Sequence, residues 1–116
     1  MPLIKLQTSV KCSDEQKQRI ASQLSAVCAG EIGKPETYVA SIVEDDAVIT
    51  FGGAAADAAF VVVKSIGGLN SSVNNALSKA ICASLENELG IAGDKVYINF
   101  VDVKASDWGW NGSTFG

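Results

Sequence analysis

The sequence predicts an α+β domain in which two pseudo-symmetric strand–helix–strand units form one four-stranded mixed sheet, with both helices on one face. The same order of patterns, strand then helix then strand, occurs twice, over about 1–56 and 57–116. The chain of 116 residues has the size of one domain, and each half is too short to cover its own sheet. The two halves are therefore expected to pack together as a single domain, 1–116.

The first unit begins with an expected strand over 3–10, where aliphatic and β-forming residues alternate weakly with polar ones. Ser13 and Gln16 have the spacing of a capping box, which predicts the start of a helix. Apolar residues then recur at helical spacing, so this helix is expected to continue to about Glu31. The apolar stripe consists of Ile20, Leu24, Val27 and Cys28.

The first helix is expected to stop at residues 33–35, Gly-Lys-Pro, because glycine and proline end helices. A second strand is predicted over 38–43, and the chain stays extended over 47–51. Residues 52–57 are small and flexible, which predicts a connector between the two halves.

The second unit repeats this plan with a strand over 60–66, a helix over 71–89 and a strand over 96–103. Asn70 or Ser71 caps the helix, and Gly90 ends it. Its apolar stripe has four-residue spacing and consists of Val73, Leu77, Ile81, Leu85 and Leu89.

Two features predict contact with another subunit. The strand over 60–66 is apolar on consecutive residues, so the sheet face without helices also needs cover. The tail over 108–116 holds two tryptophans and a phenylalanine around an Asn-Gly turn, and these aromatic side chains would be poorly covered on a monomer. An oligomer of this chain is the simplest arrangement that covers both.

Composition excludes several classes of function. Nine Lys and Arg against thirteen Asp and Glu give a net charge of −4, which offers nucleic acid and anionic membranes no basic surface. There is no histidine, so His-based triads and His-ligated metal sites are excluded. The phosphate-loop and dinucleotide patterns are also missing, and we expect neither a metal nor a cofactor.

The three cysteines, Cys12, Cys28 and Cys82, are too far apart for a CxxC motif and are expected to be reduced thiols. The N-terminal residues show no secretion signal, and no apolar run is long enough to span a membrane. We therefore expect a cytoplasmic location, with export by a route that needs no signal peptide as the alternative.

Pro2 is the first candidate for acid–base chemistry. Removal of Met1 would expose a secondary amine at the start of a strand, and burial beside Leu3 and Ile4 would lower the pKa of that amine toward neutral pH. The alternative is that proline is merely tolerated at the first position of a strand.

Several segments carry a more specific signal when they are taken together, in order and over essentially the whole chain. They are Met1-Pro2, 33–40, 51–53, 65–67, 94–99 and 109–115. With these segments the chain resembles the macrophage migration inhibitory factor family of the tautomerase superfamily. The resemblance implies the tautomerase fold, a homotrimer with active sites between adjacent subunits, and cofactor-free keto–enol tautomerisation of small aromatic 2-oxo acids such as phenylpyruvate, or of dopachrome-like substrates.

The resemblance also implies roles for individual residues. Pro2 would be the general base, and Lys34 together with the backbone N–H of Ile66 would hold the substrate carboxylate. Tyr97 and Asn99 would come from the neighbouring subunit, and their spacing places both on one face of a strand. The remaining pocket residues would be Tyr38, Ser65, Trp108 and Phe115.

Each of these residues has a structural alternative. Lys34 could be a solvated lysine after a helix, Tyr38 and Tyr97 could be core or interface aromatics, and Asn99 could form hydrogen bonds at a sheet edge. Ser65 is either a pocket-lining residue or a hydrogen-bonding residue of a loop, because no histidine could activate it as a nucleophile.

Departures from the family pattern narrow what is implied. Residues 58–61 replace the CxxC motif of the mammalian cytokine, so thiol–disulfide exchange is not expected. The lone Arg19 lies on the polar side of the first helix, which argues against dehalogenation. A cytokine-like, receptor-binding role is the alternative function; Asp46 matches an acidic position of the receptor-directed surface, but the region of Lys11 and Cys12 lacks its arginine, which argues against receptor binding.

Overall fold

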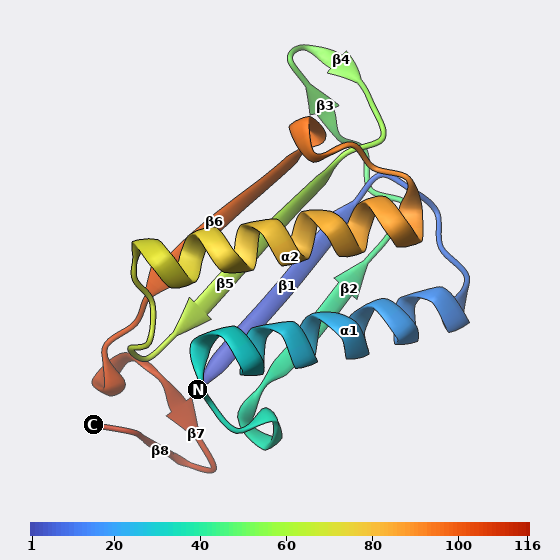
Figure 1. Ribbon diagram of the computed structural model, residues 1–116. Helices are drawn as coiled ribbons and strands as arrows, with labels where there is room; N and C mark the ends of the chain where they lie inside the picture. The colour runs from blue at the N-terminus through green and yellow to red at the C-terminus, as the bar shows by residue number, and fades with distance from the viewer.

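The computed structural model describes residues 1–116 and contains the two predicted strand–helix–strand units (Figure 1). The first unit comprises β1 (Pro2–Thr8), α1 (Asp14–Ile32) and β2 (Ala40–Glu44), and the second comprises β5 (Ala59–Ser65), α2 (Ser71–Leu89) and β6 (Val96–Asp102). Two small hairpins and three short 3₁₀ helices complete the chain. The hairpins are β3–β4 (Thr50–Phe51 and Ala54–Ala55) and β7–β8 (Gly109–Trp110 and Ser113–Thr114), and the 3₁₀ helices are η1 (Glu36–Tyr38), η2 (Gly93–Lys95) and η3 (Ala105–Asp107).

The main sheet has the strand order β2-β1-β5-β6 and is mixed, as predicted. Strands β1 and β2 are parallel, β5 and β6 are parallel, and the central pair β1 and β5 is antiparallel. Each helix is the crossover of a parallel pair, and both helices lie on the same face of the sheet (Figure 1). Neither helix combines the length and the apolar character that crossing a membrane requires.

The predicted caps form at both helix starts. The Ser13 hydroxyl accepts a hydrogen bond from the Gln16 backbone N–H, and the Gln16 side chain accepts one from the Ser13 backbone N–H. Asn70, the first of the two proposed caps of α2, accepts a hydrogen bond from the Val73 N–H at 2.9 Å. Local side chains therefore fix both starts.

The core lies between the helices and the sheet. The predicted apolar stripes face it, since Ile20, Leu24 and Cys28 of α1 and the central residues of the α2 stripe are buried. From the sheet, Ile4 and Leu6 of β1 complete this layer together with Val61 and Val63. The alternate residues of each strand point to the opposite side, which we call the helix-free face.

The helix-free face is rich in apolar side chains that no part of the chain covers. Phe60 is 40% exposed, and Tyr97 beside it on β6 is 63% exposed. The face is defined by Leu3, Lys5, Gln7, Ala40, Ile42, Glu44, Phe60, Val62, Lys64, Tyr97, Asn99 and Val101. It also holds an ion pair between Lys5 and Glu44, with a separation of 3.1 Å.

Several predicted bounds differ in the structure; the first strand, for example, covers Pro2–Thr8 and ends two residues before the predicted position. The second strand begins at Ala40 instead of residue 38, because Pro35 starts the 3₁₀ turn η1, in which the Tyr38 N–H donates to the Pro35 carbonyl at 3.1 Å. The expected connector over 52–57 contains part of a hairpin, in which Gly52-Gly53 forms the two-residue turn between β3 and β4.

Candidate active site

Two adjoining cavities lie at the end of the sheet where β1 begins and β5 ends. They share Met1, Tyr38 and Phe115. The first has a volume of about 320 Å³ and is also lined by Pro2, Thr37, Val39, Ala40, Trp108 and Trp110. The second has a volume of about 380 Å³ and is also lined by Lys34, Pro35, Ile66 and Ala105.

Six of the predicted residues line these cavities, and they come from different parts of the chain: Pro2, Lys34, Tyr38, Ile66, Trp108 and Phe115. Pro2 is buried as the first residue of β1, opposite Ser65 at the end of β5. Lys34 follows α1, and Tyr38 ends η1. The elements that converge at this end of the sheet thus bring the predicted base next to the predicted carboxylate-binding residues.

The C-terminal hairpin supplies the aromatic wall. The rings of Trp110 and Phe115 stack with a centroid separation of 6.0 Å and an interplanar angle of 14°. The Phe115 N–H donates to the Trp108 carbonyl at 3.2 Å, which fixes the segment against the residue after η3. A flat aromatic substrate could stack on such a wall.

The turn after β5 presents an unpaired backbone donor. The Ser65 carbonyl accepts a hydrogen bond from the Val103 N–H at 2.9 Å, on the β6 side. The next peptide N–H, that of Ile66, has no acceptor within the chain. Since a trans peptide directs its C=O and N–H in opposite directions, the Ile66 N–H points away from β6 and toward β1, where Pro2 lies.

Ser65 itself is fully buried, and its hydroxyl donates to the Gly67 carbonyl at 2.7 Å. The loop hydrogen bond, one of the two alternatives for this residue, is therefore present. Its hydroxyl is used within the chain, and Ser65 is not among the residues that line the two cavities.

The electrostatic surroundings favour a neutral amine at the start of β1. Burial lowers the pKa of the Met1 amino group, and the positive charge of Lys34 lowers it further. Cys28 of α1 is the other ionisable group that acts on this amine. Burial raises the pKa of the Cys28 thiol to about 11. That thiol is protonated at neutral pH and does not compete as a base.

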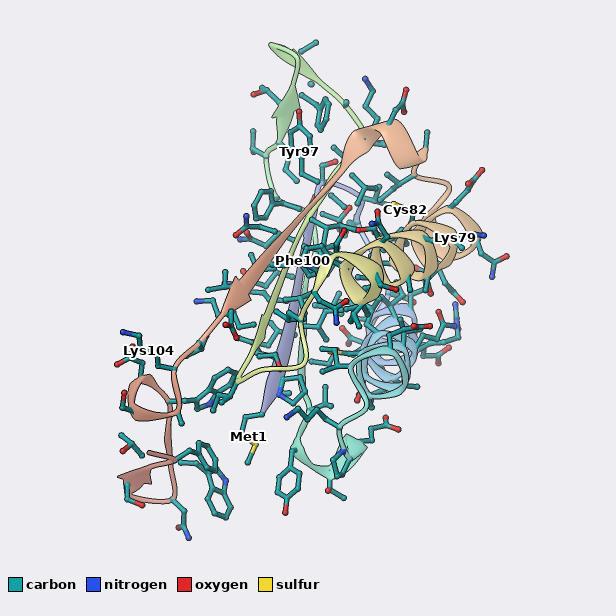
Figure 2. All side chains as sticks on the ribbon, turned by 60° about the vertical axis from the view of Figure 1, so that its left-hand side comes forward. Met1, Lys79, Cys82, Tyr97, Phe100 and Lys104 are labelled. Atoms are coloured by element: carbon teal, nitrogen blue, oxygen red, sulfur yellow. The ribbon has the colours of Figure 1, made fainter.

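Tyr97 and Asn99 lie away from these cavities in the same chain. Tyr97 is level with Gln7, five residues further along β1 than Pro2, which corresponds to about 17 Å. Figure 2 shows Tyr97 and Met1 at opposite ends of the sheet. Both Tyr97 and Asn99 are exposed on the helix-free face, as their spacing predicts.

A third cavity of about 170 Å³ surrounds Tyr97 at its own end of the sheet, together with Phe51 and Phe60. The Tyr97 and Phe51 rings are 4.8 Å apart, and the Lys95 ammonium lies 5.1 Å from the centre of the Phe51 ring. Tyr97 is thus a surface aromatic of this chain, available to another subunit.

Two residues of the site escaped the sequence analysis. Trp110 lines the first cavity, and its position directly before the Asn-Gly turn, in the same aromatic tail as Phe115, could have indicated it. Asp102 accepts a hydrogen bond from the Gly67 N–H at 3.2 Å, a contact that depends on the register of β5 and β6 and has no signal in the sequence. No cluster of three or more His, Cys, Asp or Glu side chains could hold a metal ion.

Comparisons with known proteins agree with this arrangement. The family model described as macrophage migration inhibitory factor matches residues 1–116. A homolog of that factor from Trichuris trichiura is 41% identical over 115 residues, covering 99% of this chain and 100% of the relative. The structure of a homologue from Prochlorococcus marinus superposes with a TM-score of 0.93 at 41% identity, covering 98% of this chain and 99% of that chain.

A macrophage migration inhibitory factor-like protein from Entamoeba histolytica superposes with a TM-score of 0.94 at 35% identity, covering 98% of each chain. Sequence and fold therefore agree over almost the entire length, and they support a tautomerase or cytokine-like role. The chain belongs to the macrophage migration inhibitory factor family.

Proposed function

We propose that the protein is a cofactor-independent tautomerase of small aromatic 2-oxo acids, of the phenylpyruvate or dopachrome type. One observation carries the proposal: the start of β1 lies in an aromatic-lined cavity beside Lys34 and the unpaired Ile66 N–H, where the surroundings lower the pKa of an amine. A base and an anion-binding pair would thus share one site.

The base would be the nitrogen of Pro2 after removal of Met1. While Met1 is attached, this nitrogen belongs to a tertiary amide and has no basic lone pair. Once free, it becomes a secondary amine in the surroundings that lower the pKa of the present terminus. Burial and the charge of Lys34 would act on this amine in the same direction, so a larger fraction of it would be neutral at pH 7 than of the same amine exposed to solvent.

Tautomerisation needs one proton to move from carbon to oxygen. The Pro2 nitrogen accepts a proton from the carbon next to the ketone, and the electron pair of that C–H bond shifts to give an enolate. The protonated Pro2 nitrogen then gives this proton to the enolate oxygen, directly or through a water molecule, which gives the enol and restores the neutral amine. Lys34 and the Ile66 N–H would hold the carboxylate, and the stacked Trp110 and Phe115 would receive the aromatic ring.

The complete site would lie between subunits of a homotrimer. Tyr97 is level with a position five residues from Pro2 of its own chain, and neither Tyr97 nor Asn99 lines the cavities; both are exposed on the helix-free face. A neighbouring subunit that covers this face could receive both side chains in its own site.

The first test is the rate of phenylpyruvate keto–enol conversion, with the intact mass of each sample recorded to show whether Met1 is present. Pro2→Ala should lower the rate by roughly 10²–10⁴-fold, the usual contribution of a positioned general base. Protein that retains Met1 is the matched control, because it keeps every side chain and should be inactive. Full activity in either sample would contradict the assignment of Pro2.

A cytokine-like role is the second function that family membership supports. In that role a receptor would bind the outer surface of the protein, and the cavity around Pro2 would not be needed. Receptor binding that persists in Pro2→Ala, in protein without tautomerase activity, would favour it over the enzyme.

A further inference from the structure

We propose that Asp102 is a positioning residue, which holds the turn after β5 so that the Ile66 N–H stays directed at the substrate carboxylate. The inference deepens the proposed function, because it concerns the anion-binding half of the same site. Asp102 is the last residue of β6 and pairs in register with Ser65, the last residue of β5. It therefore lies beside the turn and outside the cavity lining.

The turn needs such a constraint because of its composition. Gly67 and Gly68 are consecutive, and both have left-handed backbone angles, with φ of 72° and 80°. A pair of glycines has more conformational freedom than any other pair of residues, so the backbone of the pair does not by itself maintain the orientation of the Ile66–Gly67 peptide.

Two side chains hold the polar groups of Gly67 from neighbouring strands. The Asp102 carboxylate accepts from the Gly67 N–H at 3.2 Å, and the Ser65 hydroxyl donates to the Gly67 carbonyl at 2.7 Å. The Val103 N–H holds the Ser65 carbonyl at 2.9 Å, which orients the peptide that carries the Ile66 N–H. The Val103 contact therefore fixes the Ser65–Ile66 peptide, and the Asp102 contact fixes the Ile66–Gly67 peptide that follows it.

The charge of Asp102 has the opposite effect on an anion. A carboxylate near the anion site repels a second carboxylate, so Asp102 lowers affinity by its charge while it raises affinity by holding the turn. The two effects predict different results for two substitutions. Asp102→Asn keeps an oxygen acceptor and removes the charge, whereas Asp102→Ala removes both.

The experiment measures binding of 3-phenylpropanoate, a carboxylate that cannot tautomerise, and of the neutral 3-phenylpropanamide. Binding to Met1-free protein is followed by calorimetry and by the ¹H–¹⁵N signal of Ile66. Asp102→Ala should weaken binding of the carboxylate by about tenfold, and Asp102→Asn should bind it at least as tightly as the natural protein. The amide should bind equally to all three proteins, and the Ile66 signal should shift only with the carboxylate.

Asp57→Ala is the matched control, because Asp57 is exposed just before the opposite end of β5 and its side chain forms no hydrogen bond or ion pair. Ser65→Ala should also weaken binding of the carboxylate, because it removes the hydrogen bond that holds the Gly67 carbonyl. Unchanged or tighter carboxylate binding in Asp102→Ala would overturn the inference, as would a natural protein that binds no carboxylate.

The binding data are independent of turnover. Weaker carboxylate binding in Asp102→Ala, in a protein that is inactive toward phenylpyruvate, would support the inference and contradict the proposed function. Natural protein that is active toward phenylpyruvate, but whose carboxylate affinity does not depend on Asp102, would support the proposed function and contradict the inference.

Discussion

At the scale of single residues, Gly68 is constrained by how closely the end of α1 packs against its backbone. Gly68 has a φ of 80°, and a Cβ atom there would lie 2.7 Å from Cγ2 of Ile32 and 3.5 Å from Cε of Lys34. The missing side chain leaves room for the end of α1 and for the stem of the lysine that would bind the carboxylate. Gly68 therefore connects stability to the position of Lys34.

Gly68→Ala should destabilise the protein by about 1 kcal/mol through the left-handed backbone and by about 1–3 kcal/mol more through the contact with Ile32. Gly52→Ala is the control, because its φ is 63° and nothing lies within 4 Å of the added atom. Urea denaturation at one protein concentration should show the larger loss for Gly68→Ala. Equal losses for the two variants would show that Ile32 moves aside at little cost.

At the scale of whole elements, the two helices are joined by a polar network on their outer surface. The Arg19 guanidinium of α1 contacts the Glu88 carboxylate of α2 at 2.9 Å, and the Gln23 amide donates to the same carboxylate at 2.9 Å. The Ser84 hydroxyl donates to Gln23 at 2.9 Å. Arg19 thus has a structural role between the helices.

This network predicts a pH dependence of stability. The hydrogen bonds from Arg19 and Gln23 hold the pKa of Glu88 below its ordinary value of 4.5. A carboxyl group with a lowered folded-state pKa contributes full stability above its unfolded pKa and loses that contribution as the pH falls through the folded pKa. Natural protein should therefore exceed Glu88→Gln in unfolding temperature at pH 7, and the difference should shrink below about pH 4.5.

The comparison is made by thermal unfolding between pH 3 and pH 7, with Glu86→Gln as the matched control. Glu86 lies in the same helix and forms no side-chain hydrogen bond or ion pair. A difference between natural protein and Glu88→Gln that does not change over this range would show that the carboxylate charge contributes nothing.

Elements whose signals are local could be predicted from the sequence. Helix α2 begins after Asn70, one of the two predicted caps, and ends before Gly90, and α1 ends one residue beyond the prediction. Both helices could be predicted because their caps and apolar stripes lie within or beside the helices themselves. Hairpin β3–β4 was not predicted, since Ala54 and Ala55 carry no alternation. The contact of Asp102 with Gly67 was also missed, because it depends on strand register, which a single sequence does not contain.

At the scale of the whole molecule, the single chain leaves its helix-free face uncovered and its proposed site divided. The cavities around Pro2 and the exposed pair Tyr97 and Asn99 occupy separate parts of the sheet. The predicted fold is confirmed, whereas the homotrimer stays a prediction that follows from the uncovered face and from family membership. Only an assembly would place Tyr97 near a substrate.

Mixing of two variants with lowered activity tests this assembly. In a trimer with shared sites, Pro2→Ala and Tyr97→Ala would each lack one residue in every site. If each site takes Pro2 from one subunit and Tyr97 from the next, every mixed trimer contains one intact site, and activity should return to roughly one third of the natural value per mixed trimer. Denaturing and refolding the two variants together, followed by the phenylpyruvate assay, measures this. Mixtures no more active than the separate variants would contradict a shared site.

The position of the amino terminus in this site has a practical consequence for titration. The chain has no histidine, and the pKa values of its three thiols are all raised. A terminal amine ordinarily titrates between about pH 6 and 8, whereas the ordinary pKa values of the other side-chain types present lie outside this window and those of the thiols are raised away from it. Protons released across this window, counted by potentiometry, report the ionisation of that single nitrogen, so the protein carries its own isolated probe of the site.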